Sequence, residues 1–207
     1  VRRCPDRGYE CDKMAKEKLK HFVSKEALNI DGFGKKIVEN FWSLGLIKLP
    51  QDIFNLNYSK IESMDGWGKQ SVANLKYSIN QRKTISFEKF IYALGIRHIG
   101  LENAKIISKN IKSIKNFIAL SKKSNFDDLI NIDGIGETQI NSIKDFFSNK
   151  INLSVLKNLA ELLKVKDAET PRVGGLFNNK TFMFTGKLLN MSRSEAKSLI
   201  EQNSGSI

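Results

Sequence analysis

The chain has few of the residues and runs that mark special classes of protein. Its 207 residues include only two cysteines, too few for a disulfide framework, so a reducing compartment is expected. No stretch approaches the roughly 20 apolar residues of a membrane span, and no secretory signal is recognisable at the start. Hydrophobic residues still make up 41% of the chain, which is ordinary for a folded protein. We expect a folded cytoplasmic protein without a membrane partner.

Acidic residues are scarce relative to basic ones. Against 34 lysines and arginines stand 22 aspartates and glutamates, which gives a formal net charge of +12 at pH 7. This balance favours a polyanionic partner, such as nucleic acid, over a small acidic metabolite. A lysine-rich but inert surface is the alternative that charge alone leaves open.

A short turn of the form Gly-x-Gly, or a near relative, recurs four times between helix-like stretches. The four copies are Ile30-Asp31-Gly32-Phe33-Gly34, Met64-Asp65-Gly66-Trp67-Gly68, Leu94-Gly95-Ile96-Arg97-His98-Ile99-Gly100 and Ile132-Asp133-Gly134-Ile135-Gly136. Their last glycines lie 34, 32 and 36 residues apart (68−34, 100−68, 136−100). A unit of this length is a supersecondary repeat that needs its neighbours to bury its apolar side. The pattern predicts four helix-hairpin-helix motifs, with Phe33, Trp67 and Ile135 plugging the hairpins into the helices.

Such a hairpin directs backbone N–H groups outward at the start of a helix, where an anion can bind. One glycine supplies the positive φ of a tight reversal, and the second keeps side-chain bulk away from an approaching phosphate. The candidate DNA-binding residues are Gly32, Gly34, Lys35, Lys36, Gly66, Gly68, Lys69, Gly95, Arg97, His98, Gly100, Gly134 and Gly136. Cations accompany the first three hairpins and Glu137 follows the fourth, so we expect the first three to contact DNA more strongly. A helical scaffold that binds protein is the alternative.

Apolar periodicity predicts a series of helices joined by short loops. Helices are expected over residues 12–24, 35–44, 69–81, 86–94, 102–110, 138–147 and 153–163, with no strand among them. Residues near several predicted starts are expected to be N-caps: Asp52, Ser59, Ser86, Ser113 and Asp127. The fold class predicted is therefore mostly α, with tandem helix-hairpin-helix repeats in a compact all-α domain at residues 29–163.

The character of the chain changes after residue 163. Residues 164–175 are polar and rich in chain breakers, which indicates a linker. A buried strand at 180–186 and a helix at 192–202 then form the start of a β-α-β unit within residues 176–207. Because the chain begins at Val1 rather than Met and ends where a strand pattern begins, we expect a piece of a longer protein.

Cys4 and Cys11, with six residues between them, are half of the ligand set that a structural zinc site requires. Two unrelated thiols are the alternative, and His21 lies too deep in its predicted helix to serve as a third ligand. His98 has no recognisable nucleophile or carboxylate pair beside it, so a turn or phosphate-side histidine is favoured over a catalytic base. No catalytic residue is assigned.

Two further motifs join the four hairpins: His21-Phe22-Val23-Ser24, and Thr185-Gly186-Lys187-Leu188 with Met191-Ser192-Arg193. Together they resemble the C-terminal half of the bacterial NAD-dependent DNA ligase family, over essentially all of the chain. The resemblance implies that residues 1–28 end a four-cysteine zinc finger, with Cys4 and Cys11 as its last two ligands. It further implies that residues 176–207 begin a BRCT domain. The spacing of the two cysteines is slightly longer than in the family.

The resemblance also implies a function: sealing nicks in duplex DNA during replication and repair. In the family, a lysine is adenylated from NAD with magnesium present, and AMP then passes to the 5′-phosphate before the 3′-hydroxyl seals the nick. The parts that hold NAD and magnesium would lie before Val1, so this segment is expected to be inactive alone. Its expected partner is nicked double-stranded DNA, held by the backbone with little sequence preference, and a monomer is expected.

Two other classes of function stay open. A DNA glycosylase built on one helix-hairpin-helix would need a catalytic Asp facing a base pocket, and four repeats argue against it. A helix-hairpin-helix accessory subunit of another repair system would bind DNA without chemistry, and preference for a fork over a nick would favour it.

Overall fold

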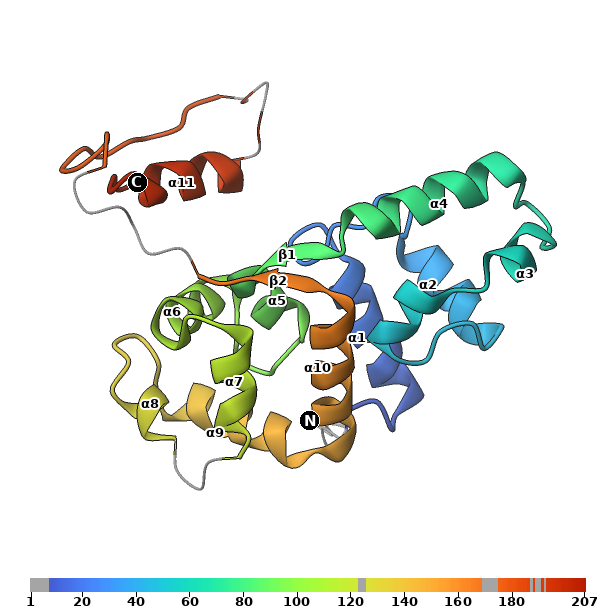
Figure 1. Ribbon diagram of the computed structural model, residues 1–207, viewed down its shortest axis with the longest axis horizontal. Helices are drawn as coiled ribbons and strands as arrows, with labels where there is room; N and C mark the ends of the chain where they lie inside the picture. The colour runs from blue at the N-terminus through green and yellow to red at the C-terminus, as the bar shows by residue number, and fades with distance from the viewer. Residues whose placement is uncertain (1–7, 123–125, 169–174, 187, 189–190, 192) are drawn as a thin grey trace. The chain divides into compact units, whose positions relative to one another are not determined.

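Short helices joined by tight turns make up most of the chain. The structure, a computed structural model, describes residues 8–122, 126–168, 175–186, 188, 191 and 193–207 (Figure 1). The elements in chain order are α1 (Asp12–Val23), α2 (Lys35–Ser43), the 3-10 helix η1 (Pro50–Asn55), α3 (Tyr58–Glu62), α4 (Lys69–Gln81), β1 (Thr84–Ser86), α5 (Phe87–Ala93), α6 (Leu101–Ile111), α7 (Ile114–Leu120), α8 (Asp127–Ile130), α9 (Glu137–Ser148), α10 (Lys150–Leu162), β2 (Lys164–Lys166) and α11 (Arg193–Gln202). The chain divides into two units, residues 1–168 and 169–207.

Most of the longer helices of the first unit bury one stripe of apolar residues. In α2, Val38, Phe41 and Trp42 are buried at helical spacing, as the 3.6-residue period requires. Each helix predicted from periodicity begins and ends within three residues of an observed one. The prediction of a mostly α fold is confirmed.

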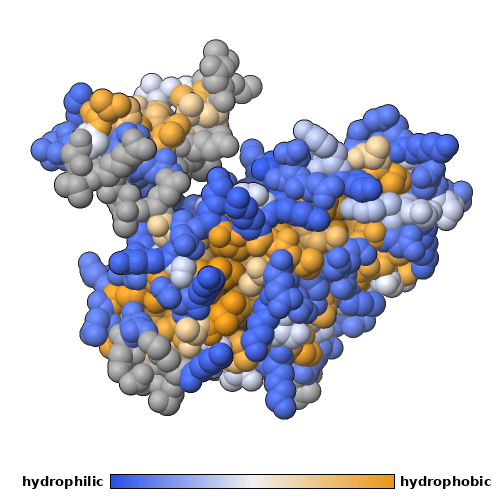
Figure 2. All heavy atoms as spheres, viewed as in Figure 1, coloured by the Kyte–Doolittle hydropathy of each residue, from blue (hydrophilic) through white to orange (hydrophobic). Residues whose placement is uncertain are grey.

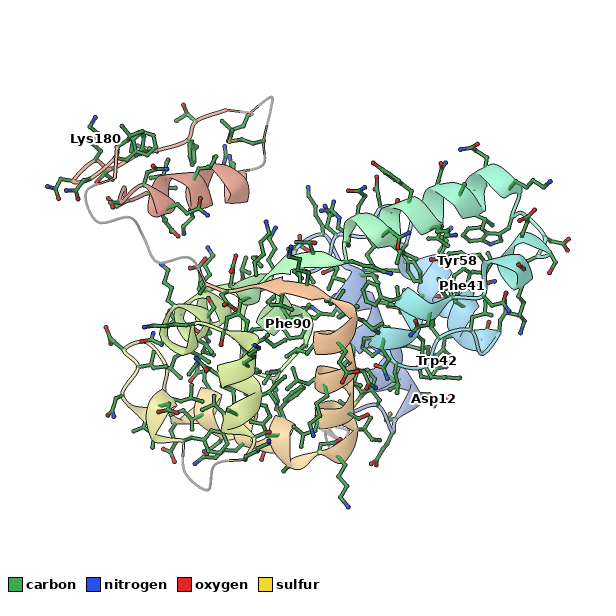
Figure 3. All side chains as sticks on the ribbon, viewed as in Figure 1. Asp12, Phe41, Trp42, Tyr58, Phe90 and Lys180 are labelled. Atoms are coloured by element: carbon green, nitrogen blue, oxygen red, sulfur yellow. The ribbon has the colours of Figure 1, made fainter. Side chains whose placement is uncertain are left out.

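Aromatic side chains connect the first two hairpins inside this unit. Phe33, from the first hairpin, packs against Phe41 of α2 with ring centroids 5.6 Å apart, and Phe41 in turn lies 5.6 Å from Trp67 of the second hairpin. Figure 3 shows Phe41 and Phe90 in the interior, and both are fully buried. Such aromatic pairs contribute about 0.5–1.5 kcal/mol beyond their buried area. Phe33 and Trp67 therefore act as the predicted plugs, with Trp67 only half-buried.

A parallel pair of three-residue strands corrects two predictions: the linker from residue 164, and the absence of a strand within residues 29–163. β1 and β2 pair in register Thr84↔Lys164 to Ser86↔Lys166, so residues 164–166 are a strand of the first unit and not the start of a linker. Ile85 is buried and Val165 half-buried, while the lysines of β2 are exposed. A three-residue strand has too few positions to show a period, and its partner lies 80 residues away in the sequence (164−84). Local patterns therefore could not indicate it.

Three of the five predicted N-caps differ in the structure. The Ser113 hydroxyl accepts the N–H of Asn116 at the start of α7, as predicted. At α3 the cap is Asn57, whose side chain accepts the N–H of Lys60, and not Ser59. Asp52 lies inside η1 and reaches back to the N–H of Leu49. At α8 the N-cap is Phe126 and not Asp127, whose side chain lies outside the described residues. Ser86 is the N-cap of α5, without a side-chain cap hydrogen bond.

The second unit contains α11 and, among its described residues, one isolated parallel bridge, Thr181↔Ser206. The predicted strand at 180–186 is thus reduced to that bridge, next to which the Phe182 N–H donates to the Ser206 oxygen at 2.8 Å. Phe177 and Phe182 pack with ring centroids 4.9 Å apart. The predicted helix at 192–202 matches α11, and Ser192 lies outside the described residues.

Candidate nucleic-acid interface

The four hairpins share one backbone turn. We name them corner 1 (residues 30–34), corner 2 (64–68), corner 3 (96–100) and corner 4 (132–136). In each, the fourth residue donates its N–H to the oxygen of the first: Phe33 to Ile30 at 3.2 Å, and Trp67 to Met64, Ile99 to Ile96 and Ile135 to Ile132 at 3.1 Å. The third residue of every turn has positive φ: Gly32 at 73°, Gly66 at 80°, His98 at 60° and Gly134 at 83°. The repeat in the sequence is therefore a repeat in geometry.

Each corner ends on a glycine that begins a helix. Gly34, Gly68, Gly100 and Gly136 are the N-caps of α2, α4, α6 and α9, all with extended backbone. A glycine has no side chain to accept the first N–H groups of the helix, and such groups need a partner from elsewhere. Aligned at the positive end of the helix dipole, they suit a phosphate oxygen.

Corner 3 departs from the predicted glycine pattern. Gly95 is not its turn glycine: it follows the C-cap of α5, with φ 62°, and its N–H donates to the Tyr92 oxygen at 3.1 Å. His98 takes the turn position instead, a conformation that costs a non-glycine residue free energy. The Asn103 side chain supports this turn by donating to the His98 oxygen at 3.0 Å. Arg97 stands where the other corners have aspartate, so the tip of corner 3 is cationic.

The corners differ in the space around their glycines. Among the described residues, and apart from its neighbours in the sequence, no atom lies within 4 Å of a Cβ placed on Gly32, Gly34, Gly66, Gly68 or Gly100. At corner 4, a Cβ on Gly134 would lie 3.0 Å from Ile106 Cδ1, and one on Gly136 would lie 3.3 Å from Gln139 Oε1. Corners 1, 2 and 3 are thus open to a ligand, whereas corner 4 is partly covered by α6 and α9.

Corners 1 and 2 border the same groove. Its volume is about 620 Å³, and Gly32 and Gly66 lie on its wall. The other wall is α4, which contributes Asn74 and Tyr77, the latter 66% exposed. Hydrophilic residues cover much of α4 on the face in Figure 2. Sequence reasoning missed these α4 residues because they look like an ordinary solvent face until the hairpins are placed beside them.

The predicted cations lie on the surface beside the open corners. Lys35 and Lys36 begin α2, Lys69 begins α4, and Arg97 and His98 form the tip of corner 3; all five side chains are exposed. In the described part of the chain, none of them forms an ion pair. Cations without a carboxylate partner stay available to phosphate.

The β1–β2 pair places exposed lysines on the first unit that were predicted to lie in a linker. Lys164 and Lys166 lie beside Thr84 and Ser86 in the strand register, with both lysines exposed. The Lys164 N–H donates to the Lys83 oxygen at 2.7 Å, which keeps a third exposed lysine close by.

Of the predicted metal ligands, only Cys11 falls within the described residues. It is half-buried at the N-cap of α1, and Cys4 lies outside the described residues. Within the described ranges, no group of three or more His, Cys, Asp or Glu side chains could hold a metal ion. Zinc stays a prediction.

Ion pairing fixes α1 against α2, the helix that follows corner 1. Lys20 Nζ lies 2.7 Å from carboxylate oxygens of both Glu17 and Glu39. These hydrogen bonds raise the pKa of Lys20, and the bond from Lys20 lowers the pKa of Glu39.

No helix in the described ranges is both long and apolar enough to cross a bilayer.

Comparisons with known proteins agree with this geometry. Residues 89–156, which contain corners 3 and 4, match the family described as "Helix-hairpin-helix motif". The whole chain is 63% identical over 207 residues to a DNA ligase of Pelagibacter ubique, and 97% of it aligns at 43% identity with a DNA ligase of Rickettsia bellii. The chain is homologous to one segment of the bacterial DNA ligases. It spans about a third (31%) of the length of these relatives.

This homology extends to both units, because the Pelagibacter alignment covers 100% of the chain. Rickettsia rickettsii (strain Sheila Smith) provides a further DNA ligase, 42% identical over 97% of the chain. The resemblance to DNA ligases seen in the sequence motifs is therefore confirmed by alignments over 97–100% of this chain.

Proposed function

We propose that this chain is the DNA-gripping C-terminal segment of an NAD-dependent DNA ligase, which seals nicks in duplex DNA in replication and repair. Corners 1, 2 and 3 bind the sugar–phosphate backbone through the first N–H groups of α2, α4 and α6. Lys35, Lys36, Lys69 and Arg97 strengthen this contact as cations beside the bound phosphates, and the exposed His98 ring adds a hydrogen-bond donor. Corner 4 mainly packs against its neighbours.

One observation carries the proposal. Four turns of the same geometry start helices with glycine N-caps, and three of them are open to solvent with cations beside them. Backbone N–H groups recognise phosphate without reading bases, so the binding has little sequence preference. A grip of this kind suits an enzyme that must act on any sequence containing a nick.

The segment contributes affinity and not chemistry. We assign no step of adenylation or sealing to the described residues. NAD and magnesium belong to other parts of the longer protein in this proposal. The segment alone, a cytoplasmic monomer, is expected to leave nicks unsealed.

Zinc is the second part of the proposal. Cys4 and Cys11 would be two ligands of a four-cysteine structural site, and zinc would fix the chain that leads into α1. The half-buried position of Cys11 directly before α1 supports this role. Zinc analysis of a polypeptide extended to the length of the relatives tests it: about one zinc per chain is expected, and none would contradict it.

The test of the function is binding of the folded 207-residue chain to fluorescent duplexes that are nicked, intact or forked. We expect submillimolar binding with a steep loss of affinity as salt rises, and the tightest binding to the nicked duplex. Preference for the fork would favour an accessory subunit of another repair system. Release of a damaged base from a duplex would favour a glycosylase, and no binding at low salt would contradict DNA binding altogether.

A further inference from the structure

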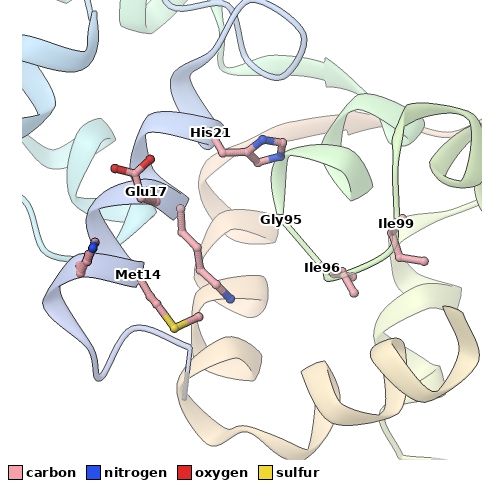
Figure 4. Close-up of a pocket in the computed structure, with 8 residues that line it drawn as sticks. Met14, Glu17, His21, Gly95, Ile96 and Ile99 are labelled. Atoms are coloured by element: carbon pink, nitrogen blue, oxygen red, sulfur yellow. The ribbon is translucent and has the colours of Figure 1, made fainter. Parts of the chain in front are cut away.

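His21 of α1 lies beside Gly95, the residue directly before corner 3 (Figure 4). His21 Nε2 lies 2.8 Å from the backbone oxygen of Tyr92 in α5. A carbonyl oxygen can only accept, so the ring nitrogen donates. The same oxygen accepts the N–H of Gly95 at 3.1 Å. His21 therefore adds a side-chain bond to the C-terminal end of α5, where the chain enters corner 3.

The imidazole ring also packs against this junction. The His21 and Tyr92 rings meet edge to face with centroids 4.6 Å apart. A Cβ on Gly95 would lie 3.4 Å from His21 Cδ2, so the ring lies close against the backbone of Gly95. In Figure 4, His21 and Gly95 line one cavity of about 560 Å³ together with Ile96 and Ile99 of corner 3.

A second side chain of α1 contacts the helix that follows corner 1. Lys20, the residue before His21, binds Glu39 of α2 at 2.7 Å, and α2 begins at corner 1. Neighbouring side chains of α1 thus contact the helix of one open corner and the entry to another. The motif His21-Phe22-Val23-Ser24 has no other role in the proposed interface.

We propose that His21 is a positioning residue, which holds corner 3 in its DNA-binding orientation from α1. The inference rests on the proposed DNA-binding function. Without the Nε2–H donor, the Tyr92 oxygen keeps only backbone N–H donors, and the chain from α5 to Arg97 is held less firmly against α1. His21 itself needs no contact with DNA. Its effect on affinity must therefore pass through the contacts of corner 3.

A double-mutant cycle between His21→Ala and Arg97→Ala tests this dependence. Affinity for a nicked duplex is measured for the four proteins at several salt concentrations. We expect His21→Ala alone to weaken binding about five- to tenfold, as the loss of one good hydrogen bond would. In the Arg97→Ala background, the same change should have a clearly smaller effect, because only the remaining contacts of corner 3 can still be lost. Additive losses would overturn the proposal.

Two more variants separate positioning from a general loss of stability. His21→Gln keeps an amide donor near the place of Nε2 and should restore most of the affinity, whereas equal losses in His21→Gln and His21→Ala would contradict the proposal. Glu39→Gln removes the negative charge from the α1–α2 ion pair without touching corner 3, so its effect should add to that of Arg97→Ala. If the unsubstituted chain, folded by circular dichroism, bound no DNA, the proposed function would fail before this inference was reached.

Discussion

Corners 2 and 4 have the same turn and opposite surroundings. Both place a glycine at φ near 80° and begin a helix on a second glycine. Around corner 2 there is open space and the cation Lys69, whereas corner 4 is backed by Ile106 and followed by Glu137. The turn therefore identifies the motif, while the surrounding space and charge determine whether a phosphate can reach it.

Charge reversal at the open corners should have the largest effect on DNA binding. Lys36→Glu with Lys69→Glu, at the open corners, should lower affinity for nicked duplex about a hundredfold at about 100 mM salt. It should also reduce the slope of log affinity against log salt by about two units, because two phosphate contacts are lost. The matched control, Lys150→Glu with Lys157→Glu, changes the net charge equally on exposed positions of α10. Equal losses in both proteins would mean that only net charge matters.

A methyl group at the N-cap glycines tests the open space directly. Gly68 and Gly136 both have negative φ, so alanine is tolerated by the backbone at either position. Gly68→Ala should weaken DNA binding about tenfold by blocking the approach to the first N–H groups of α4. Gly136→Ala should leave binding within about twofold. The comparison fails if Gly136→Ala weakens binding as much as Gly68→Ala does, measured by the same titration.

Substitution of the two turn glycines should lower the stability of the protein by different amounts. Gly66→Ala and Gly134→Ala each place a side chain at positive φ, which costs about 1 kcal/mol. At Gly134 the added Cβ also presses on Ile106 Cδ1 at 3.0 Å, so its loss should be greater by about 0.5–1 kcal/mol. Urea unfolding of both variants measures the difference. A larger loss of unfolding free energy in Gly66→Ala than in Gly134→Ala would contradict the tighter packing around Gly134.

A smaller effect is expected from the charge that distinguishes corner 4. Glu137→Gln removes a carboxylate from the start of α9, where it favours the helix dipole. If corner 4 stays away from DNA, affinity should rise by less than about twofold and the salt slope should not change. A slope steeper by about one unit would show that this corner takes part in binding.

The sequence was sufficient for the features set by local periodicity. Most of the helices and the four corners were predicted because apolar residues recur at helical spacing and glycines at a fixed interval. No range was predicted for the short elements η1, α3, α7 and α8. Corner 3 was predicted only in outline: Gly95 was counted as a turn glycine because two residues of the true turn, Arg97 and His98, do not look like turn formers. Their turn is recognisable from the hydrogen bond between Ile99 and Ile96.

Features made by distant segments could not be predicted. The β1–β2 pair joins residues 80 apart, and the groove between corners 1 and 2 depends on Phe41 holding both hairpins. The covering of Gly134 by Ile106 is likewise a tertiary contact. The predicted order of DNA contact among the corners rests on a local signal, the charge at the helix starts, with Lys69 at one and Glu137 at another.

Backbone amide shifts on adding DNA test the central claim most directly. The first N–H groups of the helices at the open corners, those of Lys35, Lys69 and Leu101, should shift strongly when the isotope-labelled chain binds a nicked duplex. The N–H of Glu137 should shift little under the same conditions. Strong shifts confined to other parts of the chain, with Lys35, Lys69 and Leu101 unchanged at saturation, would contradict the claim that these helix starts hold the phosphate backbone.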